Sequence, residues 1–195
     1  MVEIDVYDLD ETLLRGNSTR LYLGALLRVA IRHGQVVTAL RTAGAAALRV
    51  ARLTSHRRFK WQLWHARAGL SQWAAANFRY EFARGFVKML RPSMVNALTA
   101  SRRAGRHILV ATAGYAEVPR LLRTRIDGVV GTETAAARSF KEYAECRGAE
   151  KADRVRRYAE ALGGVVATIY TDGADDGPLL AAFPEARHCI VGHDD

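Results

Sequence analysis

The chain has 195 residues, of which 49% are hydrophobic and 25% charged, a composition typical of a globular protein with one domain or one domain plus an insertion. Its two cysteines, Cys146 and Cys189, have neither metal-ligand spacing nor the number that a disulfide framework needs. The N-terminus is acidic and alternating, and no uncharged apolar run reaches about 18 residues, so we expect neither a signal peptide nor a membrane-spanning helix.

The net charge of +9 is distributed unevenly along the chain. Residues 15–91 contain 15 Lys or Arg and one acid, Glu81, and therefore carry +14, whereas the rest of the chain carries −5. A basic segment is thus inserted into a mildly acidic one. This asymmetry predicts two modules with different partners.

The hydrophobic pattern predicts a short buried strand over residues 2–7, followed by a helical region and then by alternating strands and helices. Helices are expected at about 17–33, 35–53, 55–68, 71–90 and 93–104. The later strands are expected at 106–111, 126–130, 165–170 and 188–191, with helices at 116–123, 148–162 and 178–182. This order predicts an α/β fold with a parallel sheet, helices on both faces, and ligands at the carboxyl ends of the strands.

The helix expected at 35–53 is amphipathic. Its apolar side is formed by Val37, Leu40, Gly44, Ala47, Leu48 and Ala51, and Arg41, Arg49 and Arg52 fall toward the other side. Such a helix can lie on an anionic bilayer with its arginines at the headgroups. Alternatively, the arginines form a solvated face over a small core of apolar and aromatic side chains. The sequence leaves both interpretations open.

Carboxylates cluster where two of the predicted strands end. Asp8 and Asp10 follow the first strand, and paired carboxylates can divide the work of nucleophile and proton carrier. Attack on a phosphate dianion also needs a cation, and Mg²⁺ prefers carboxylates, phosphate oxygen and water. Asp172, Asp175 and Asp176 follow a later strand and can supply further ligands.

Two weaker signals accompany these carboxylates. Thr112 ends the strand expected at 106–111, and its hydroxyl, with the backbone N–H groups from Ala113 onward, can hold a phosphate oxygen. Lys151, near the start of a helix, can offset the charge of the carboxylates and stabilise an oxyanion. Each signal alone fits an ordinary loop, helix cap or surface lysine. Together with the two carboxylate clusters they make four signals. These occur in one order along the chain, three of them at strand ends, and this combination indicates a catalytic site.

These motifs resemble the haloacid dehalogenase superfamily of phosphohydrolases. The pattern of that superfamily is DxDxT, then Ser or Thr, then Lys, then an acidic DxxxD motif. The matching residues here are Asp8, Asp10, Thr12, Thr112, Lys151, Asp172 and Asp176. The resemblance covers the whole chain and implies a three-layer Rossmann-like core formed by residues 1–14 and 91–195, with an inserted all-α cap at 15–90.

The resemblance also implies a role for each residue. Asp8 is the nucleophile that forms an aspartyl-phosphate, and Asp10 is the general acid and then the general base. Mg²⁺ is held by Asp8, Asp10 through its carbonyl, and Asp172. The phosphate-binding residues are Thr112, Ala113 and Lys151, and the supporting residues are Thr12, Asp175 and Asp176.

The position of the insertion resembles subfamily IB, the phosphoserine-phosphatase-like group with a helical C1 cap. Two departures stand out: Asp175 lies where relatives often carry Asn, and no acid follows Thr12 until Glu81. The second departure argues against phosphoserine as substrate, because phosphoserine phosphatases read it with a Glu soon after the first motif. The basic cap resembles that of bacterial phosphatidylglycerophosphate phosphatases, whose apolar cap helices face the membrane.

The sequence therefore predicts a cytoplasmic, Mg²⁺-dependent phosphomonoester hydrolase whose substrate is set by its basic cap. A phospholipid-type phosphate such as phosphatidylglycerophosphate, with peripheral contact to an anionic membrane, is one interpretation. A soluble sugar or nucleotide phosphatase is another. A non-catalytic module that binds anionic membrane or nucleic acid is the competing class; the complete set of motifs argues against it, and a nucleic-acid partner is not favoured. The oligomeric state stays open.

Overall fold

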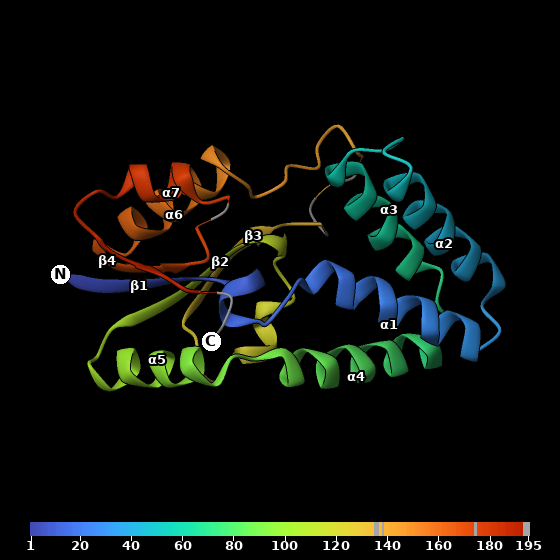
Figure 1. Cartoon of the computed structure of the whole chain (residues 1–195), viewed down its shortest axis with the longest axis horizontal. Helices are drawn as coiled ribbons and strands as arrows, with labels where there is room; N and C mark the ends of the chain where they lie inside the picture. Colours follow the sequence, from blue (N-terminus) through green and yellow to red (C-terminus); the bar gives the residue numbers. More distant parts are fainter. Residues whose placement is uncertain (135–136, 138, 174, 193–195) are drawn as a thin grey trace. The chain divides into compact units, whose positions relative to one another are not determined.

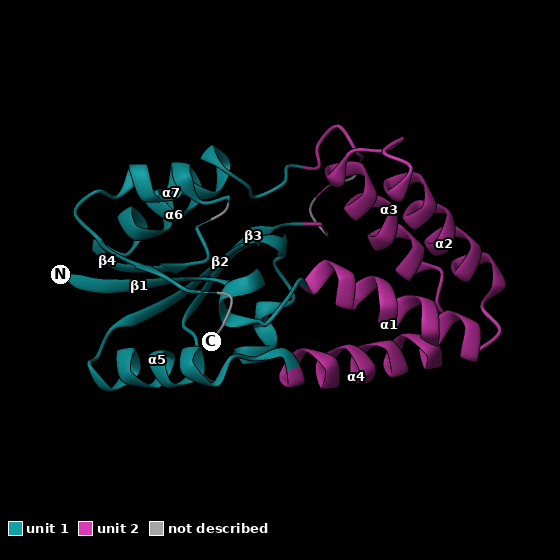
Figure 2. Cartoon of the chain, viewed as in Figure 1, with its two compact units in different colours: residues 1–17, 89–133, 144–195 teal, residues 18–88, 134–143 magenta. Residues whose placement is uncertain are grey.

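The computed structural model describes residues 1–134, 137, 139–173 and 175–192. The chain groups into two compact units, coloured separately in Figure 2. Unit 1 consists of Met1–Asn17, Met89–Glu133 and Ala144–Asp195, and unit 2 consists of Ser18–Lys88 and Thr134–Tyr143. Unit 2 thus contains a segment far along the chain that lies outside the insertion expected at 15–90.

Unit 1 is built on a parallel five-stranded sheet with the order β3-β2-β1-β4-β5 (Figure 1). Its strands are β1 Val2–Asp8, β2 His107–Tyr115, β3 Gly128–Thr132, β4 Gly164–Thr171 and β5 Arg187–Ile190. Its helices are α5 Pro92–Arg103, α6 Ala149–Ala161 and α7 Gly177–Ala182. In Figure 1, α5 lies on one face of the sheet and α6 and α7 on the other. The predicted α/β fold with a parallel sheet is confirmed.

Strand β1 occupies the centre of this sheet. It pairs in parallel with β2 on one side and β4 on the other, with Tyr7 opposite Val110 and Tyr170. Ile4 and Val6 are completely buried, as expected for a strand covered on both faces. Asp8, the last residue of β1, therefore leaves the sheet at the middle of its carboxyl edge.

The segment after β1 does not stay extended. It forms a turn, η1 Leu9–Leu13, closed by the Leu14 N–H, which donates to the Leu9 carbonyl at 2.9 Å, and Glu11 within it has a φ of +58°. A positive φ is uncommon for a residue with a side chain, and Arg91 donates a hydrogen bond of 3.2 Å to the carbonyl oxygen of Glu11. Arg91 is buried and also donates to the carbonyl of Gly192 at 3.2 Å, so it holds this turn against the C-terminal segment.

The path after β2 differs from the prediction. Strand β2 continues through Thr112 to Tyr115, because its pairing with β3 shifts register and resumes with Tyr115 opposite Thr132. The helix predicted at 116–123 is wrong. Only a 3₁₀ turn, η2 Pro119–Leu122, follows, and the N–H of Ala116 is still bonded to the carbonyl of Thr132 in β3.

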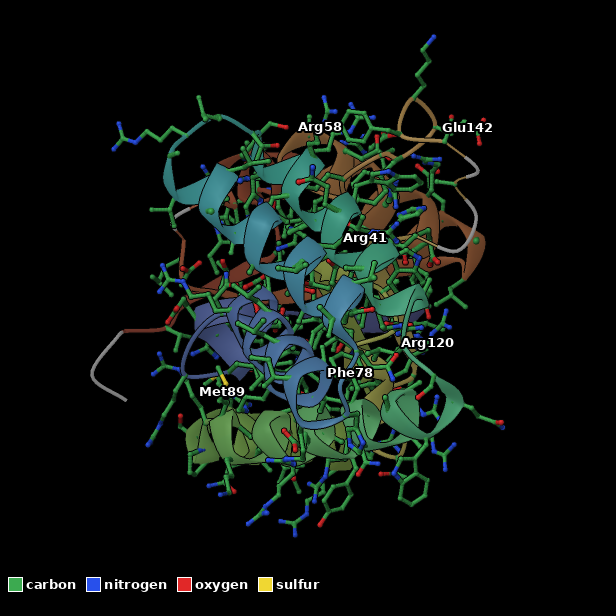
Figure 3. The ribbon with its side chains drawn as sticks, turned by 90° about the vertical axis from the view of Figure 1, so that its right-hand side faces the viewer. Arg41, Arg58, Phe78, Met89, Arg120 and Glu142 are labelled. Atoms are coloured by element: carbon green, nitrogen blue, oxygen red, sulfur yellow. The ribbon has the colours of Figure 1, made fainter. Side chains whose placement is uncertain are left out.

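Unit 2 contains the four helices predicted between residues 17 and 90. They are α1 Ser18–Arg32, α2 Val36–Val50, α3 His56–Ala68 and α4 Gln72–Met89. Tyr22 from α1 makes edge-to-face contacts with Phe78 and Phe82 from α4, with ring centroids 4.9 and 5.6 Å apart. Phe78 is labelled in Figure 3. These rings form the aromatic core that the sequence indicated for this region.

The segment Thr134–Tyr143 joins unit 2 through α3. The Arg57 guanidinium donates to the carbonyl oxygens of Tyr143 at 2.7 Å and Phe140 at 3.0 Å. It also lies 4.8 Å from the centre of the Phe140 ring, while the Trp61 ring lies 5.3 Å from that of Tyr143. One arginine and one tryptophan therefore fasten a distant segment to the helices.

Helix α2 exposes its apolar side. Val36, Val37 and Leu40 are 64%, 62% and 68% exposed, whereas Thr38 and Thr42 on the opposite side are buried. Thr42 satisfies its hydroxyl by donating to the carbonyl of Thr38 at 2.7 Å. The threonine side of α2 is therefore the buried side, and its larger apolar side chains are exposed. Among the described residues, no helix has both the length and the apolar character required to cross a membrane.

The segment that leads into the helical insertion and the segment that leaves it are hydrogen-bonded to each other within unit 1. The Arg15 N–H donates to the Met89 carbonyl at 2.7 Å, and the Arg91 N–H donates to the Leu13 carbonyl at 2.9 Å. Leu14 and Leu90 form an antiparallel bridge between them. The chain therefore leaves unit 1 and returns to it through one hydrogen-bonded pair of segments.

Candidate active site

Three segments of unit 1 meet at the carboxyl edge of the sheet. Asp8 ends β1, Lys151 lies in the first turn of α6, and Asp176 precedes α7. The Lys151 ammonium donates to Asp8 Oδ1 at 2.6 Å and to both carboxylate oxygens of Asp176 at 2.8 and 2.9 Å. All three side chains are buried, with Lys151 3% exposed. The site thus holds one buried cation between two carboxylates.

Burial and charge act against each other at this site. Burial raises the pKa of Asp8 from 3.8 to about 7, and the nearby charges of Asp176 and Asp10 act in the same direction, while the Lys151 ammonium opposes them. Burial alone lowers the pKa of Lys151, but the two carboxylates outweigh it and raise that pKa above its ordinary value. Lysine therefore stays charged, and more positive charge beside Asp8 would favour its ionised form.

Asp176 is held from a second direction by Thr171. The Thr171 hydroxyl donates to Asp176 Oδ2 at 2.7 Å, and the backbone N–H of Gly173 donates to the same hydroxyl oxygen at 3.0 Å. Gly173 has a φ of +83°, a conformation that glycine adopts without strain. The loop after β4 therefore closes on itself and fixes the carboxylate that faces Lys151. No role was predicted for Thr171, although it begins the acidic motif and directly precedes Asp172.

The turn after β1 supplies a hydrogen bond to Asp8. The Thr12 hydroxyl donates to Asp8 Oδ2 at 3.3 Å, and Thr12 itself is fully buried. Asp10 lies in the same turn, half-buried, with its charge acting on the pKa of Asp8. Both predicted partners of Asp8 within the first motif are thus placed beside it.

Thr112 lies on the neighbouring strand at the same edge. Asp8 pairs with Ala111, so Thr112 follows directly beyond that partner. Its hydroxyl oxygen accepts the N–H of Gly114 at 2.9 Å, and a hydroxyl that accepts in this way still has its own hydrogen to donate. The carbonyl of Ala113 accepts a hydrogen bond of 2.8 Å from Thr132, which fixes the backbone of this turn. Thr132 is thus a supporting residue that was not predicted from the sequence.

Comparison with known proteins identifies the family. Residues 6–181 match the model of haloacid dehalogenase-like hydrolases, and this stretch includes Asp8, Lys151 and Asp176. The chain belongs to this family. The expected superfamily and hydrolase class are thereby confirmed.

Solved structures with the fold of this hydrolase come from several bacteria. A protein of unknown function from Bordetella pertussis Tohama I has a TM-score of 0.71 and 20% identity, covering 93% of this chain and 87% of that one. A probable phosphoserine phosphatase from Vibrio cholerae has a TM-score of 0.59 and 15% identity, covering 93% and 54%. A predicted phosphatase from Clostridium acetobutylicum has a TM-score of 0.55 and 13% identity, covering 99% and 86%. A search of curated proteins found no match.

In the acidic loop after β4, Asp172 and Asp175 have different surroundings. Tyr170 of β4 pairs with Tyr7 of β1, so Asp172 leaves the sheet on the same edge as Asp8. Asp175 instead points to the surface, where both of its oxygens accept hydrogen bonds of 2.7 Å from Arg147. The extra negative charge noted in the sequence is therefore paired with an arginine. Arg147 was not predicted, because its partner lies 28 residues away.

The residues at this edge offer the oxygen ligands that Mg²⁺ prefers. Within the described part of the chain, no group of three or more His, Cys, Asp or Glu side chains is arranged as a metal site. Mg²⁺ needs fewer, because it is commonly held by one or two carboxylates with other oxygen ligands and water. The carboxylates of Asp8 and Asp172, with the backbone carbonyl of Asp10, fit that requirement.

Proposed function

We propose that this hydrolase is a Mg²⁺-dependent phosphomonoester phosphatase that acts through an aspartyl-phosphate. The observation that carries this function is the buried Lys151 ammonium, held 2.6 Å from Asp8 and 2.8 Å from Asp176. A fixed cation beside a carboxylate nucleophile can neutralise the negative charge of a phosphoryl group. The family, and the phosphatases among its structural neighbours, support the same assignment.

Two carboxylates divide the reaction. A carboxylate oxygen of Asp8 attacks phosphorus while the bond to the ester oxygen breaks, and Asp10 gives its proton to the leaving alcohol. Asp10 then takes a proton from water, whose oxygen attacks phosphorus. Inorganic phosphate leaves and the Asp8 carboxylate is restored. The Thr112 hydroxyl and the Ala113 N–H hold phosphate oxygens, and so does Lys151 with the donor that faces Asp8 in the free enzyme.

Asp8, the carbonyl of Asp10 and Asp172 would hold the Mg²⁺. When bound, it supplies positive charge between carboxylate and phosphate and favours the ionised form of Asp8. Asp176 has a different task, because its oxygens are already used by Lys151 and Thr171. We assign it to orienting Lys151.

The test is phosphate release by the full chain with and without Mg²⁺, with wild type and Asp8→Asn compared. Asn fills nearly the same volume but is a far weaker nucleophile, so we expect at least about a 10³-fold loss of turnover. Circular dichroism and thermal melting should show that the variant is folded. Turnover near the wild-type level in Asp8→Asn would reject the aspartyl-phosphate mechanism.

For the substrate, we propose a phosphate ester on an anionic lipid, such as phosphatidylglycerophosphate. The observation that favours it is the outward apolar side of α2, where Val37 and Leu40 are 62% and 68% exposed. An apolar helix face within a strongly basic segment is suited to an anionic bilayer surface. A soluble sugar or nucleotide phosphate is the alternative substrate.

The two substrate classes can be separated by a paired variant. We expect Val37→Ser/Leu40→Ser to lower hydrolysis of phosphatidylglycerophosphate in anionic micelles by about tenfold, because less apolar area is buried on docking. Hydrolysis of soluble phosphomonoesters should not change. Leu121→Ser, at a 45% exposed leucine of unit 1, is the control. Faster turnover of a soluble ester by wild type, with no effect of the double variant on lipid, would favour the alternative.

A further inference from the structure

A basic site separate from the Asp8 site lies wholly within unit 2, in a groove between α1 and α4. Its hollow has a volume of about 460 Å³, which suits a small ligand. Charged side chains line it from both helices: Arg28 and Arg32 from α1, and Glu81, Arg84 and Lys88 from α4. Four cations and one carboxylate therefore share one concave surface.

Glu81 organises this surface. It is the single acid between residues 15 and 91, and it lies in the groove with its side chain 18% exposed. Its carboxylate forms an ion pair with Arg28 at 3.6 Å and a hydrogen bond with Arg32. The two arginine side chains are 58% and 62% exposed, so each guanidinium is anchored at one point and keeps other N–H groups toward solvent. Anchored guanidiniums lose less freedom when they bind an anion.

Gly85 on α4 leaves room for a side chain of α1. A Cβ atom at Gly85, which lies in the groove, would come within 2.6 Å of Leu21 Cδ1 on α1. The missing side chain therefore leaves space for Leu21 beside the cations. Tyr80 stands on the wall of the groove and is 67% exposed, which leaves its ring available to a ligand.

We propose that this groove binds a phosphate-bearing anion with two or more negative charges. Three net positive charges on a concave surface complement a pyrophosphate or phosphomonoester group, and Arg84 and Lys88 supply donors that Glu81 does not occupy in the ion pairs described here. The site goes beyond the proposed hydrolysis, because none of its residues belongs to the Asp8 site. The anion can be a free phosphate compound or the headgroup of a lipid.

The test is calorimetric titration of the full chain with inorganic pyrophosphate, in EDTA. We expect Arg84→Gln/Lys88→Gln to weaken binding by about tenfold or more, since each lost charge-assisted hydrogen bond costs a substantial part of the affinity. Arg41→Gln/Arg49→Gln removes the same charge from α2 and should change binding by less than about twofold. Asp8→Asn should bind as wild type does, which separates this site from catalysis.

Vesicles distinguish the two sources of phosphate. If pyrophosphate does not bind, but Arg84→Gln/Lys88→Gln weakens association with vesicles containing phosphatidic acid, a lipid phosphomonoester, and Arg120→Gln/Arg123→Gln at two exposed arginines of unit 1 does not, the groove binds a lipid headgroup. Equal weakening of vesicle binding by Arg84→Gln/Lys88→Gln and by Arg120→Gln/Arg123→Gln would show general attraction between charges and overturn the site. Failure of wild type to bind either probe would also overturn it.

Discussion

Among single residues, Lys151 has the most demanding surroundings. Its ammonium is 3% exposed and lies between the carboxylates of Asp8 and Asp176. A buried ion pair adds little to stability relative to an apolar replacement of the whole group, but removing one partner leaves a buried charge without compensation. The stability of unit 1 therefore depends on this lysine even apart from catalysis.

We predict that Lys151→Met lowers the free energy of unfolding by about 3–5 kcal/mol, because two buried carboxylates are left facing each other. Urea denaturation followed by circular dichroism measures this loss. Lys141→Met, at an exposed lysine, is the control and should stay within about 0.5 kcal/mol of wild type. A loss of similar size in both variants would show that the ammonium has no special structural role.

The raised pKa of Asp8 predicts a pH-dependent stability. Between pH 3.8 and about 7, the folded protein keeps a proton that the unfolded chain has released. The free energy of unfolding should therefore fall as pH rises through this window, by about 1–3 kcal/mol. Asp8→Asn lacks this proton, so urea denaturation in EDTA at pH 5 and pH 7.5 should show a smaller fall. Parallel pH dependences in the two proteins would contradict the raised pKa.

At the scale of elements, two loops at the catalytic edge are joined on the surface. Arg147, just before α6, binds both oxygens of Asp175, which lies between β4 and α7. Both side chains are largely exposed, at 44% and 64%, so the pair contributes only about 0–1 kcal/mol to stability. Its effect is to direct the Asp175 carboxylate toward the arginine.

We therefore predict that Asp175→Asn and Asp172→Asn differ. Asp175→Asn should change the Mg²⁺ concentration for half-maximal phosphate release by less than about threefold, because its carboxylate is engaged by Arg147. Asp172→Asn should raise that concentration by about tenfold or more, because a ligand charge is lost. Mg²⁺ titrations of both variants measure the difference. Similar shifts would place Asp175 at the metal.

The sequence could predict those parts of the site whose residues follow a strand directly. Asp8 ends a strand that the alternating pattern predicted, and its side chain contacts Lys151, which in turn contacts Asp176. The Arg147–Asp175 pair and the attachment of Thr134–Tyr143 to α3 depend on residues brought together only by folding. Pattern-based reasoning has no access to such pairs.

At the scale of the whole chain, the insertion begins and ends at one hydrogen-bonded base. The N–H of Arg15 meets the carbonyl of Met89, and the N–H of Arg91 meets the carbonyl of Leu13, both within unit 1. Ends that are already adjacent can be joined by a short linker at small entropic cost. The sheet of unit 1 is therefore compatible with loss of the inserted helices.

We predict that replacing residues 18–88 with a short Gly/Ser linker yields a folded unit 1. Cooperative thermal melting and a circular dichroism spectrum of α/β type are the expected result. If the helical unit selects the substrate, hydrolysis of a small soluble ester should survive while preference among substrates is lost. Absence of a cooperative transition would show that unit 1 requires unit 2 to fold.

The outward side of α2 has a consequence for the protein in the test tube. Val36, Val37 and Leu40 stand exposed on a chain with a net charge of +9. At low ionic strength, repulsion between copies keeps these apolar side chains apart. Added salt at 0.1 M screens that repulsion between charges more than about 10 Å apart. Salt does not weaken apolar attraction, and sulfate strengthens it. Copies of this chain should therefore self-associate through α2 as ionic strength rises, the reverse of the behaviour expected when charge attraction holds a complex together.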